Sequence, residues 1–310
     1  MINNWFALMD SLKNSHSEIA NLIGEARIAF IDIPMYFNVG DLLIYFGTEA
    51  FIKEYNLNVI YRTGMNVDLK KLKDVDVILF QGGGNFGDLY PHHQQLREKI
   101  TLKFPNKKII CLPQTLHFNN EEELERSAKI FKKHSDFHLY VRDQESLTIG
   151  YQFTDNIKLI PDMAHSLHPL IDINECDINR ESYRILHMVR SDKEANSNNA
   201  NNMLSKRSFD WANIISPSMY LMGRSIIILD KLRYSNSVKF WDKIASDMVF
   251  KSINYFMSHN EVYSDRLHGI ILAALLGKKI RCFDNNYKKN SRYISCWLKE
   301  YPSLKNASDF

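Results

Sequence analysis

An arginine and a histidine stand two residues apart where a helix is expected to begin. Arg266 and His268 follow the short stretch 261–263, which predicts a strand, and precede the apolar run 270–276, which predicts a buried helix. Free backbone N–H groups and the helix dipole favour a bound anion at a helix start. The pair could therefore hold a phosphate or carboxylate while a proton moves. A structural explanation stays open, with Asp265 as an N-cap, a surface arginine and a hydrogen-bonded histidine.

The first half of the chain alternates between strands and helices. Strands are expected at 28–33, 57–61, 75–80, 108–112, 137–141 and 157–160, with helices at 42–55 and 121–134. In parallel sheets, ligands bind at the carboxyl ends of strands. Four strand ends lead into Asp41, a glycine segment, Gln114 and Arg142. The alternation predicts a doubly wound α/β domain with a site at that edge.

The glycine segment contains Gly82, Gly83, Gly84 and Asn85. Its spacing formally satisfies GxGxxG, but a dinucleotide site also needs an acidic residue after the next strand, and the strand 108–112 leads into Pro-Gln-Thr. No dinucleotide is therefore predicted. Consecutive glycines indicate backbone that a ligand or another loop approaches closely, although a purely structural turn remains an alternative.

A second domain is expected after a polar, aperiodic break at 170–182. We predict an N-terminal domain over 1–172, a C-terminal domain over 183–285, and a tail over 286–310 whose helix packs back on the N-terminal domain. In the second domain, a strand at 183–189 ends at Arg190, and 238–257 predicts a helix. The Asn-rich segment 196–202 predicts a loop, and 206–235 is ambiguous.

Composition excludes several classes of protein. A net charge of +3 over 310 residues is too small to indicate nucleic-acid binding. The four cysteines form neither a CxxC motif nor a Cys/His cluster, so no metal site is predicted.

No signal peptide is visible, and no apolar run approaches the roughly 20 residues of a membrane span. We expect a cytoplasmic enzyme. The helical pattern at 3–23 could lie on a membrane, but it lacks a basic face and is expected to pack on its own domain.

Taken in order, these motifs resemble the bacterial polysaccharide pyruvyl transferase family. The segments that carry the resemblance are 38–41, 81–85, 112–115, 142–146, 161–162, 190–192, 265–269 and 285–290. They span residues 26–300 in the family's order. The sequence departs from the family in the Asn-rich loop and in 206–235, which leaves the sugar specificity open.

The resemblance implies two Rossmann-like domains facing across a cleft, as in GT-B glycosyltransferases. It implies transfer of the pyruvyl unit of phosphoenolpyruvate to two hydroxyls of one sugar, giving a cyclic ketal and phosphate without a further cofactor. The family's catalytic residues fall on Arg266, His268 and Asp41. The predicted substrate-binding residues are Arg142, Arg190, Gly82, Gly83, Gly84, Asn85, Gln114, Asn38, Leu267 and Lys288.

These residue types suit the chemistry. Phosphoenolpyruvate carries a carboxylate and a phosphate, and the arginine fork binds either group bidentately. One alkene carbon must be protonated while a sugar hydroxyl attacks its neighbour, which requires an acid and a base. We expect His268 on the donor side to be the acid, and Asp41 on the acceptor side of the N-terminal domain to be the base.

The resemblance further implies a sugar or undecaprenyl-linked oligosaccharide as acceptor, within exopolysaccharide or capsular polysaccharide synthesis. Peripheral association with the inner membrane face would follow from such an acceptor. Two alternatives remain: a GT-B glycosyltransferase using a nucleotide sugar, with Asp284 as its ribose-binding acid, and a non-catalytic glycan- or phosphate-binding protein.

Overall fold

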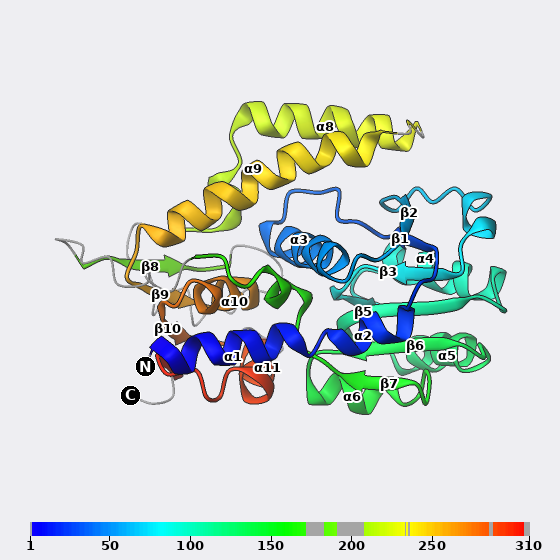
Figure 1. The fold of residues 1–310 in the computed structure, drawn as a ribbon, viewed down its shortest axis with the longest axis horizontal. Coiled ribbons are helices and arrows are strands. Elements are labelled where there is room, and N and C mark those ends of the chain that lie inside the picture. Colours follow the sequence, from blue (N-terminus) through cyan, green and yellow to red (C-terminus); the bar gives the residue numbers. More distant parts are fainter. Residues whose placement is uncertain are drawn as a thin grey trace.

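The protein is a mixed α/β structure with two parallel sheets (Figure 1). The computed structural model describes residues 2–171, 183–190, 208–232, 234, 236–284 and 288–306. The predicted Asn-rich loop and most of the predicted break at 170–182 lie outside the described residues. The division into domains stays a prediction.

The first sheet contains seven strands within the described residues, in the order β2-β1-β3-β5-β6-β7, with β4 paired to β5. Their bounds are β1 Ile28–Ile31, β2 Val59–Arg62, β3 Val77–Phe80, β4 Gly83–Gly87, β5 Lys108–His117, β6 Phe137–Val141 and β7 Ile157–Leu159. Every pair in this sheet is parallel. The central strands are apolar and fully buried, as expected for a sheet covered by helices on both faces.

Helices follow the strands of this sheet and complete the first half of the chain. They are α1 Ile2–Asn14, α2 Ser17–Ile23, α3 Val39–Glu54, α4 Pro91–Lys103, α5 Glu121–Lys132 and α6 Gln144–Gly150, with the 3-10 helices η1 Lys71–Asp74 and η2 Met163–Leu167. Asn38, Asn120 and Asp143 cap α3, α5 and α6 with side-chain oxygens. The single helix predicted at 3–23 is two helices.

The second sheet has four strands within the described residues, in the order β11-β10-β9-β8. They are β8 Ile185–Met188, β9 Glu261–Ser264, β10 Lys279–Cys282 and β11 Leu304–Asn306. Its helices are α8 Pro217–Lys231, α9 Ser237–Met257, α10 Leu267–Leu275 and α11 Lys289–Trp297, with η4 Trp211–Ile214. Helices α8 and α9 lie side by side at the top of Figure 1. The ambiguous stretch 206–235 thus includes a helix.

Three predicted boundaries near the site are wrong. Strand β5 continues to His117, so Gln114 lies inside the strand instead of after it. The ladder between β5 and β6 is irregular between Cys111 and Gln114. Pro113, which has no N–H to donate, lies within this irregularity, so the proline does not end the strand. The glycine segment, for which a structural turn was the alternative, forms strand β4. Helix α3 begins at Val39, which puts Asp41 in its first turn.

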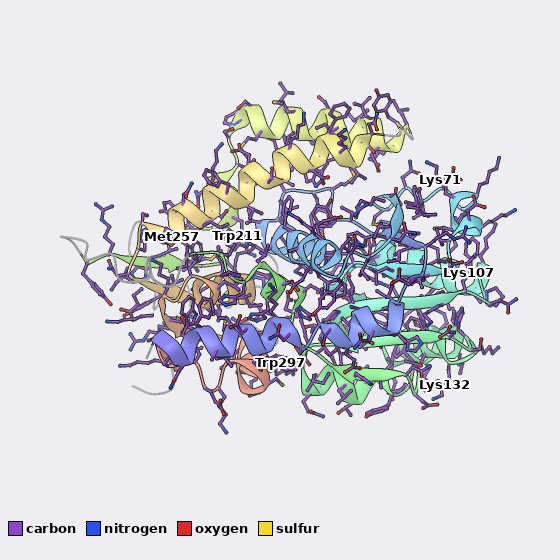
Figure 2. All side chains as sticks on the ribbon, in the orientation of Figure 1. Lys71, Lys107, Lys132, Trp211, Met257 and Trp297 are labelled. Carbon is purple, nitrogen blue, oxygen red and sulfur yellow. The ribbon has the colours of Figure 1, made fainter. Side chains whose placement is uncertain are left out.

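Indole hydrogen bonds connect elements of the two sheets. Trp5 in α1 donates to Ala274 O at 2.6 Å, Trp241 in α9 to Pro34 O at 2.9 Å, and Trp297 in α11 to Arg142 O at 2.9 Å. Surface cations such as Lys71, Lys107 and Lys132 lie at the far end of the first sheet, near the amino ends of its strands (Figure 2). Among the described residues, no helix has the length and apolar character needed to cross a membrane.

Candidate active site

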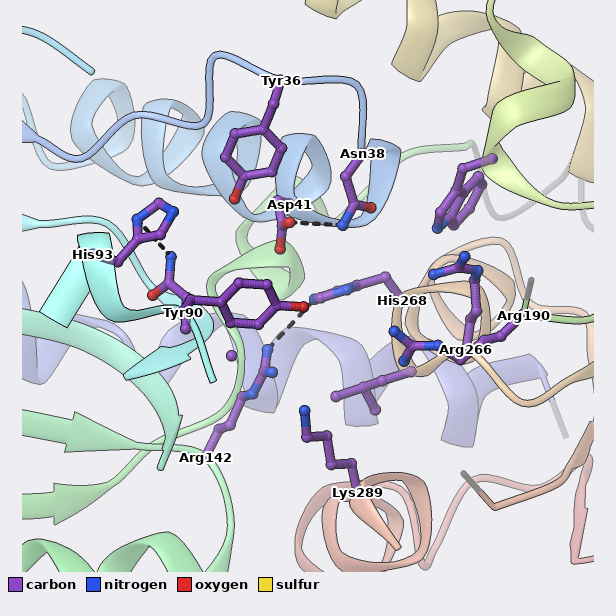
Figure 3. A pocket seen from close by; sticks show the side chains of 14 residues that line it. Tyr36, Asn38, Asp41, Tyr90, His93, Arg142, Arg190, Arg266, His268 and Lys289 are labelled. Carbon is purple, nitrogen blue, oxygen red and sulfur yellow. Dashed lines mark hydrogen bonds between the residues drawn. The ribbon is translucent and has the colours of Figure 1, made fainter. Parts of the chain in front are cut away.

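A cavity of about 370 Å³ collects most of the predicted residues. Its walls come from both halves of the chain (Figure 3). The lining residues are Tyr36, Asn38, Asp41, Gly84, Asn85, Tyr90, His93, Arg142, Arg190, Trp211, Arg266, Leu267, His268 and Lys289. The strand ends therefore meet at one site, as expected for parallel sheets.

Arg266 stands at the junction of β9 and α10. Its backbone N–H donates to Ser264 Oγ at 3.0 Å, and it is itself the N-cap residue of α10. Its Nη2 donates to Asp210 Oδ2 at 2.7 Å, and its Nε lies 2.5 Å from Asp210 Oδ1. This two-point contact orients the plane of the guanidinium at the N-terminus of α10.

Asp265 is not the N-cap that the structural explanation required. It is fully buried, and its Oδ1 accepts from the backbone N–H of Arg190 at 2.8 Å. Burial raises the pKa of this carboxyl, and the contacts with Arg190 and Arg266 oppose that rise. Asp265 therefore holds the backbone of Arg190, which lines the cavity.

His268 lies in the first turn of α10 and faces residues of the other half of the chain. Its Nε2 is 3.4 Å from Asp162 Oδ2 and 3.4 Å from Arg142 Nη1. Arg142 also forms an ion pair with Asp162 and donates from Nε to Thr115 Oγ1 at 2.8 Å. A buried carboxylate thus supports both an arginine and a histidine of the cavity.

Asp162 is charged at neutral pH although it is buried. Burial alone would raise its pKa, but Arg142 and His268 outweigh that effect and hold it well below the usual range. Its Oδ1 also accepts from Ala164 N at 2.9 Å. The charge of Asp162 is therefore fixed within the structure, 3.4 Å from His268 Nε2.

Two glycines permit close approach at this point. A Cβ on Gly40, in the first turn of α3, would lie 2.7 Å from His268 Nδ1. A Cβ on Gly84 would lie 3.1 Å from Arg142 Nη2. Neither glycine has a positive φ, so both are required by space and not by backbone conformation.

Asp41 is held from two directions on the opposite wall. The amide of Asn38 donates to its Oδ2 at 2.7 Å, while Asn38 Oδ1 caps α3 through Gly40 N. The Tyr36 hydroxyl points toward Asp41 (Figure 3). Burial raises the pKa of Tyr36, and the carboxylates of Asp41 and Asp32 raise it further, so the hydroxyl stays protonated and can donate.

Of the predicted residues, nine line the described cavity, and four do not. Gly82, Gly83, Gln114 and Lys288 lie outside the lining. Gln114 is buried and donates to Gln81 O at 2.6 Å, which stabilises the packing of β5 on the loop before β4. Lys288 is exposed with φ 51°, and its neighbour Lys289 is the buried lysine that lines the cavity.

Five lining residues were missed from the sequence: Tyr36, Tyr90, His93, Trp211 and Lys289. Tyr90 and His93 follow the glycine segment within a few residues, so their position beside a strand end was an available signal. Trp211 belongs to the ambiguous stretch and carried no such signal.

The lining is suited to an anion. Within the described residues it carries the cationic side chains of Arg142, Arg190, Arg266 and Lys289, and a single carboxylate, Asp41. Among those residues, no group of three or more histidine, cysteine and acidic side chains is arranged to hold a metal ion.

The family model for polysaccharide pyruvyl transferases matches residues 38–287. The chain belongs to this family. It is 38% identical to a putative pyruvyl transferase of Bacillus subtilis, EpsO, over 96% of this chain and 94% of the relative. It is 26% identical to pyruvyl transferase 1 of Schizosaccharomyces pombe, over 89% of this chain and 70% of that protein.

The fold also recurs in a solved structure. The crystal structure of an uncharacterised protein from Klebsiella pneumoniae matches with a TM-score of 0.60 at 22% identity, over 94% of this chain and 98% of the other. At that identity the likeness concerns the fold alone.

Proposed function

We propose that this pyruvyl transferase moves the pyruvyl group of phosphoenolpyruvate onto two hydroxyls of one sugar, forming a cyclic ketal and releasing phosphate. The acceptor belongs to a surface polysaccharide or to its lipid-linked repeat unit. The observation that carries the proposal is that Arg142, Arg266 and His268 share one cavity with Asp41. The family match supports the same chemistry.

The donor's two anionic groups are assigned to Arg142 and Arg266. Each guanidinium is oriented by a carboxylate outside the lining, Asp162 for the first and Asp210 for the second. The hydrogen bonds of Arg142 use Nε and Nη1, and Nη2 has no partner among the described residues. A pre-oriented arginine loses little freedom when it binds phosphate or carboxylate.

The proton steps are assigned to His268 and Asp41. The first sugar hydroxyl adds to C2 of the enol phosphate, its proton passing to Asp41, while His268 protonates C3. The second hydroxyl then attacks the same carbon, and phosphate leaves with the electron pair of the broken C–O bond. The fixed charge of Asp162 lies close to His268 and stabilises the His268 imidazolium until His268 gives up its proton.

The two sheets on either side of the cavity support a GT-B-like arrangement, with the donor on the side of α10 and the acceptor on the side of α3. We expect the enzyme to work in the cytoplasm, at the inner face of the membrane where lipid-linked acceptors are assembled.

The test is a donor and acceptor assay. The purified protein is incubated with phosphoenolpyruvate and a panel of 4-nitrophenyl hexosides, and parallel reactions contain nucleotide sugars instead. We expect phosphate release with phosphoenolpyruvate, and a product whose mass equals acceptor plus one pyruvyl ketal. Nucleotide release from a nucleotide sugar, without phosphate release from phosphoenolpyruvate, would overturn the proposal in favour of glycosyl transfer.

A further inference from the structure

His93 lines the cavity on the side of Asp41 and has a buried carboxylate behind it. It lies near the start of α4, and its Nδ1 is 2.7 Å from Asp32 Oδ1. The His93 side chain is 14% exposed, whereas Asp32 is fully enclosed. The histidine therefore reaches the cavity, and its orienting carboxylate does not reach solvent.

Asp32 is held in place by a second buried group. Arg97 of α4, with 0% side-chain exposure, donates to Asp32 Oδ2 at 2.9 Å. It also donates to Asn85 O at 3.1 Å and to Asn85 Oδ1 at 2.5 Å. Asn85 in turn lies on the cavity and contacts His93 Nδ1 through its amide at 3.2 Å. Asp32, Arg97, Asn85 and His93 form one connected network, which we call the Asp32 network.

The backbone of Asp32 is also unusual. It has φ 65°, directly after β1, in the left-handed region that non-glycine residues rarely adopt. Such conformations persist where the surrounding structure imposes them, and they are concentrated at functional sites. Here the conformation places the carboxylate between Arg97 and His93.

The network sets the tautomer of His93. Nδ1 lies closer to the Asp32 carboxylate (2.7 Å) than to the Asn85 amide nitrogen (3.2 Å), and a carboxylate only accepts. We therefore assign the proton of the neutral ring to Nδ1, which leaves the lone pair on Nε2. Nε2 has no hydrogen-bond partner among the described residues. Tyr36 and Tyr90 contact the ring edge-on, and Asp41 lies beyond Tyr36. A histidine oriented by a buried carboxylate, with its other nitrogen on a cavity, is the arrangement of a general base.

We propose that His93 is a second general base, which takes the proton from the second sugar hydroxyl. The inference rests on the proposed function, which requires two hydroxyls to lose protons at one carbon. In the first stage one proton goes to Asp41, and C3 gains one from His268. In the second stage the remaining hydroxyl oxygen forms its bond to C2 as the bond to phosphate breaks. Its proton goes to His93 Nε2, and then to solvent or to the departing phosphate.

Two hydroxyls at different positions each need a base, which explains why one wall of the cavity has two bases. Asp41 is bound by Asn38 and faced by Tyr36, so its carboxylate serves one position. A ring-closing attack comes from a neighbouring hydroxyl on the same sugar, which cannot occupy the same point as the first. His93 lies on the other side of Tyr36 from Asp41 (Figure 3) and supplies a base at a second position.

The test compares His93→Gln and His93→Asn with His92→Gln, which changes the exposed histidine next to it. The acceptor is the 4-nitrophenyl hexoside that wild type converts. Reactions run in D2O, are quenched at short times, and are followed by mass spectrometry together with phosphate release. Thermal melting checks folding, and calorimetry checks phosphoenolpyruvate binding.

We expect both His93 variants to bind phosphoenolpyruvate normally and to lose about 10²–10⁴-fold in ketal formation. They should accumulate the open adduct of acceptor and phosphoenolpyruvate, with one solvent deuteron on the former C3. His92→Gln should behave as wild type. Ketal formation equal to that of His92→Gln would overturn the proposal, and so would a loss of turnover without the adduct.

Failure of the proposed function looks different. Wild type itself would then release no phosphate from phosphoenolpyruvate with any acceptor. As a second measurement, Asp32→Asn should produce the same open adduct, since an amide no longer fixes the proton on Nδ1. If the His93 variants accumulate the adduct and folded Asp32→Asn does not, then Asp32 does not orient His93 for this step.

Discussion

The two walls of the cavity differ in the charge they present. The wall around α10 and α11 carries cations, and the wall around α3, β4 and α4 carries carboxylate, amide, hydroxyl and imidazole groups. On the first lie Arg190, Arg266, His268 and Lys289, and on the second Tyr36, Asn38, Asp41, Asn85, Tyr90 and His93. Arg142 follows β6 of the first sheet but reaches His268 of the other wall.

The walls also differ in how their side chains are held. Arg142 and Arg266 are held by carboxylates outside the lining, Asp162 and Asp210. On the polar wall, Asn38 donates to the lining carboxylate Asp41, and the buried Asp32–Arg97 pair holds Asn85 and His93. A wall of oriented cations suits a small molecule with two anionic groups, and a wall of acceptors and donors suits sugar hydroxyls. Under the proposed function, the donor and the acceptor would bind to opposite walls.

The largest effect is expected at His268, where the walls meet. His268→Gln keeps a polar side chain but cannot donate a proton to carbon, so turnover should fall by about 10²–10⁴-fold. Donor binding should persist, because Arg142 and Arg266 are unchanged. Wild type should lose rate on the alkaline side as the imidazolium deprotonates, and the variant should lack that limb. Near-normal turnover with an unchanged pH profile would make the histidine structural.

A second effect concerns the support beneath Asp162. His16 is fully buried, with Nδ1 2.6 Å from Ser166 Oγ and Nε2 3.1 Å from Pro161 O. Burial lowers its pKa from 6.5 to about 4. The unfolded chain binds a proton at higher pH than the folded chain does, so stability is lost as pH falls from 6.5 toward 4. At about 1.4 kcal/mol per pKa unit, the loss from His16 is roughly 3 kcal/mol.

Urea unfolding at pH 7 and pH 4 measures this loss. His16→Gln is expected to lower stability at pH 7 but to reduce its dependence on pH in this window, while His92→Gln leaves that dependence unchanged. His165, whose pKa burial lowers to about 3, adds in the same direction. An unchanged pH dependence in His16→Gln would contradict the prediction.

A third effect tests the cation wall. Arg266→Ala should weaken phosphoenolpyruvate binding by about 10- to 150-fold, the value of a charge-assisted hydrogen bond of roughly 1.5–3 kcal/mol. Arg142→Ala should do the same, with a loss of stability because the buried Asp162 loses its arginine partner. Arg224→Ala, on the exposed face of α8, is the control. If both cavity variants bind phosphoenolpyruvate as tightly as wild type does, the donor does not bind to these arginines.

The sequence predicted the cation wall better than the polar wall. Arg142 directly follows strand β6, and Arg266 and His268 lie between strand β9 and the strongly apolar helix α10. A parallel sheet brings such positions together. Asp32 also ends a strand, but its role depends on Arg97, which lies in a helix with no clear apolar periodicity. A buried arginine within a polar helix looks like a surface residue in the sequence.

The local sequence pattern also could not locate the element boundaries near the site. Pro113 argues for a strand end, yet β5 continues through it because its neighbours β4 and β6 supply the pairing on both sides. The same tertiary pairing makes a strand of the glycine segment, whose residues have low intrinsic preference for one. The succession of strands along the first half of the chain and the buried helix α10 needed no such context, since apolar runs indicate them.

The smallest effects are expected from two glycines of the polar wall, one close to His268 and the other close to Arg142. In Gly40→Ala the new methyl lies 2.7 Å from His268 Nδ1, so the imidazole must shift. In Gly84→Ala it lies 3.1 Å from Arg142 Nη2, and a displacement of a few tenths of an ångström relieves the contact. Each change should cost less than loss of the side chain it displaces, and Gly84→Ala should cost less than about 1.4 kcal/mol, or tenfold.

The two variants should affect different kinetic parameters. Gly40→Ala should lower kcat with little change in phosphoenolpyruvate affinity, because it moves the proton donor away from the reacting carbon. Gly84→Ala should weaken donor binding with kcat nearly intact, because it moves an arginine that binds an anion throughout the reaction. Melting temperatures near that of wild type would show that the cavity changed and not the fold. If both variants changed the same parameter, anion binding and proton donation would not belong to different side chains. The assignment of separate roles to Arg142 and His268 would then be wrong.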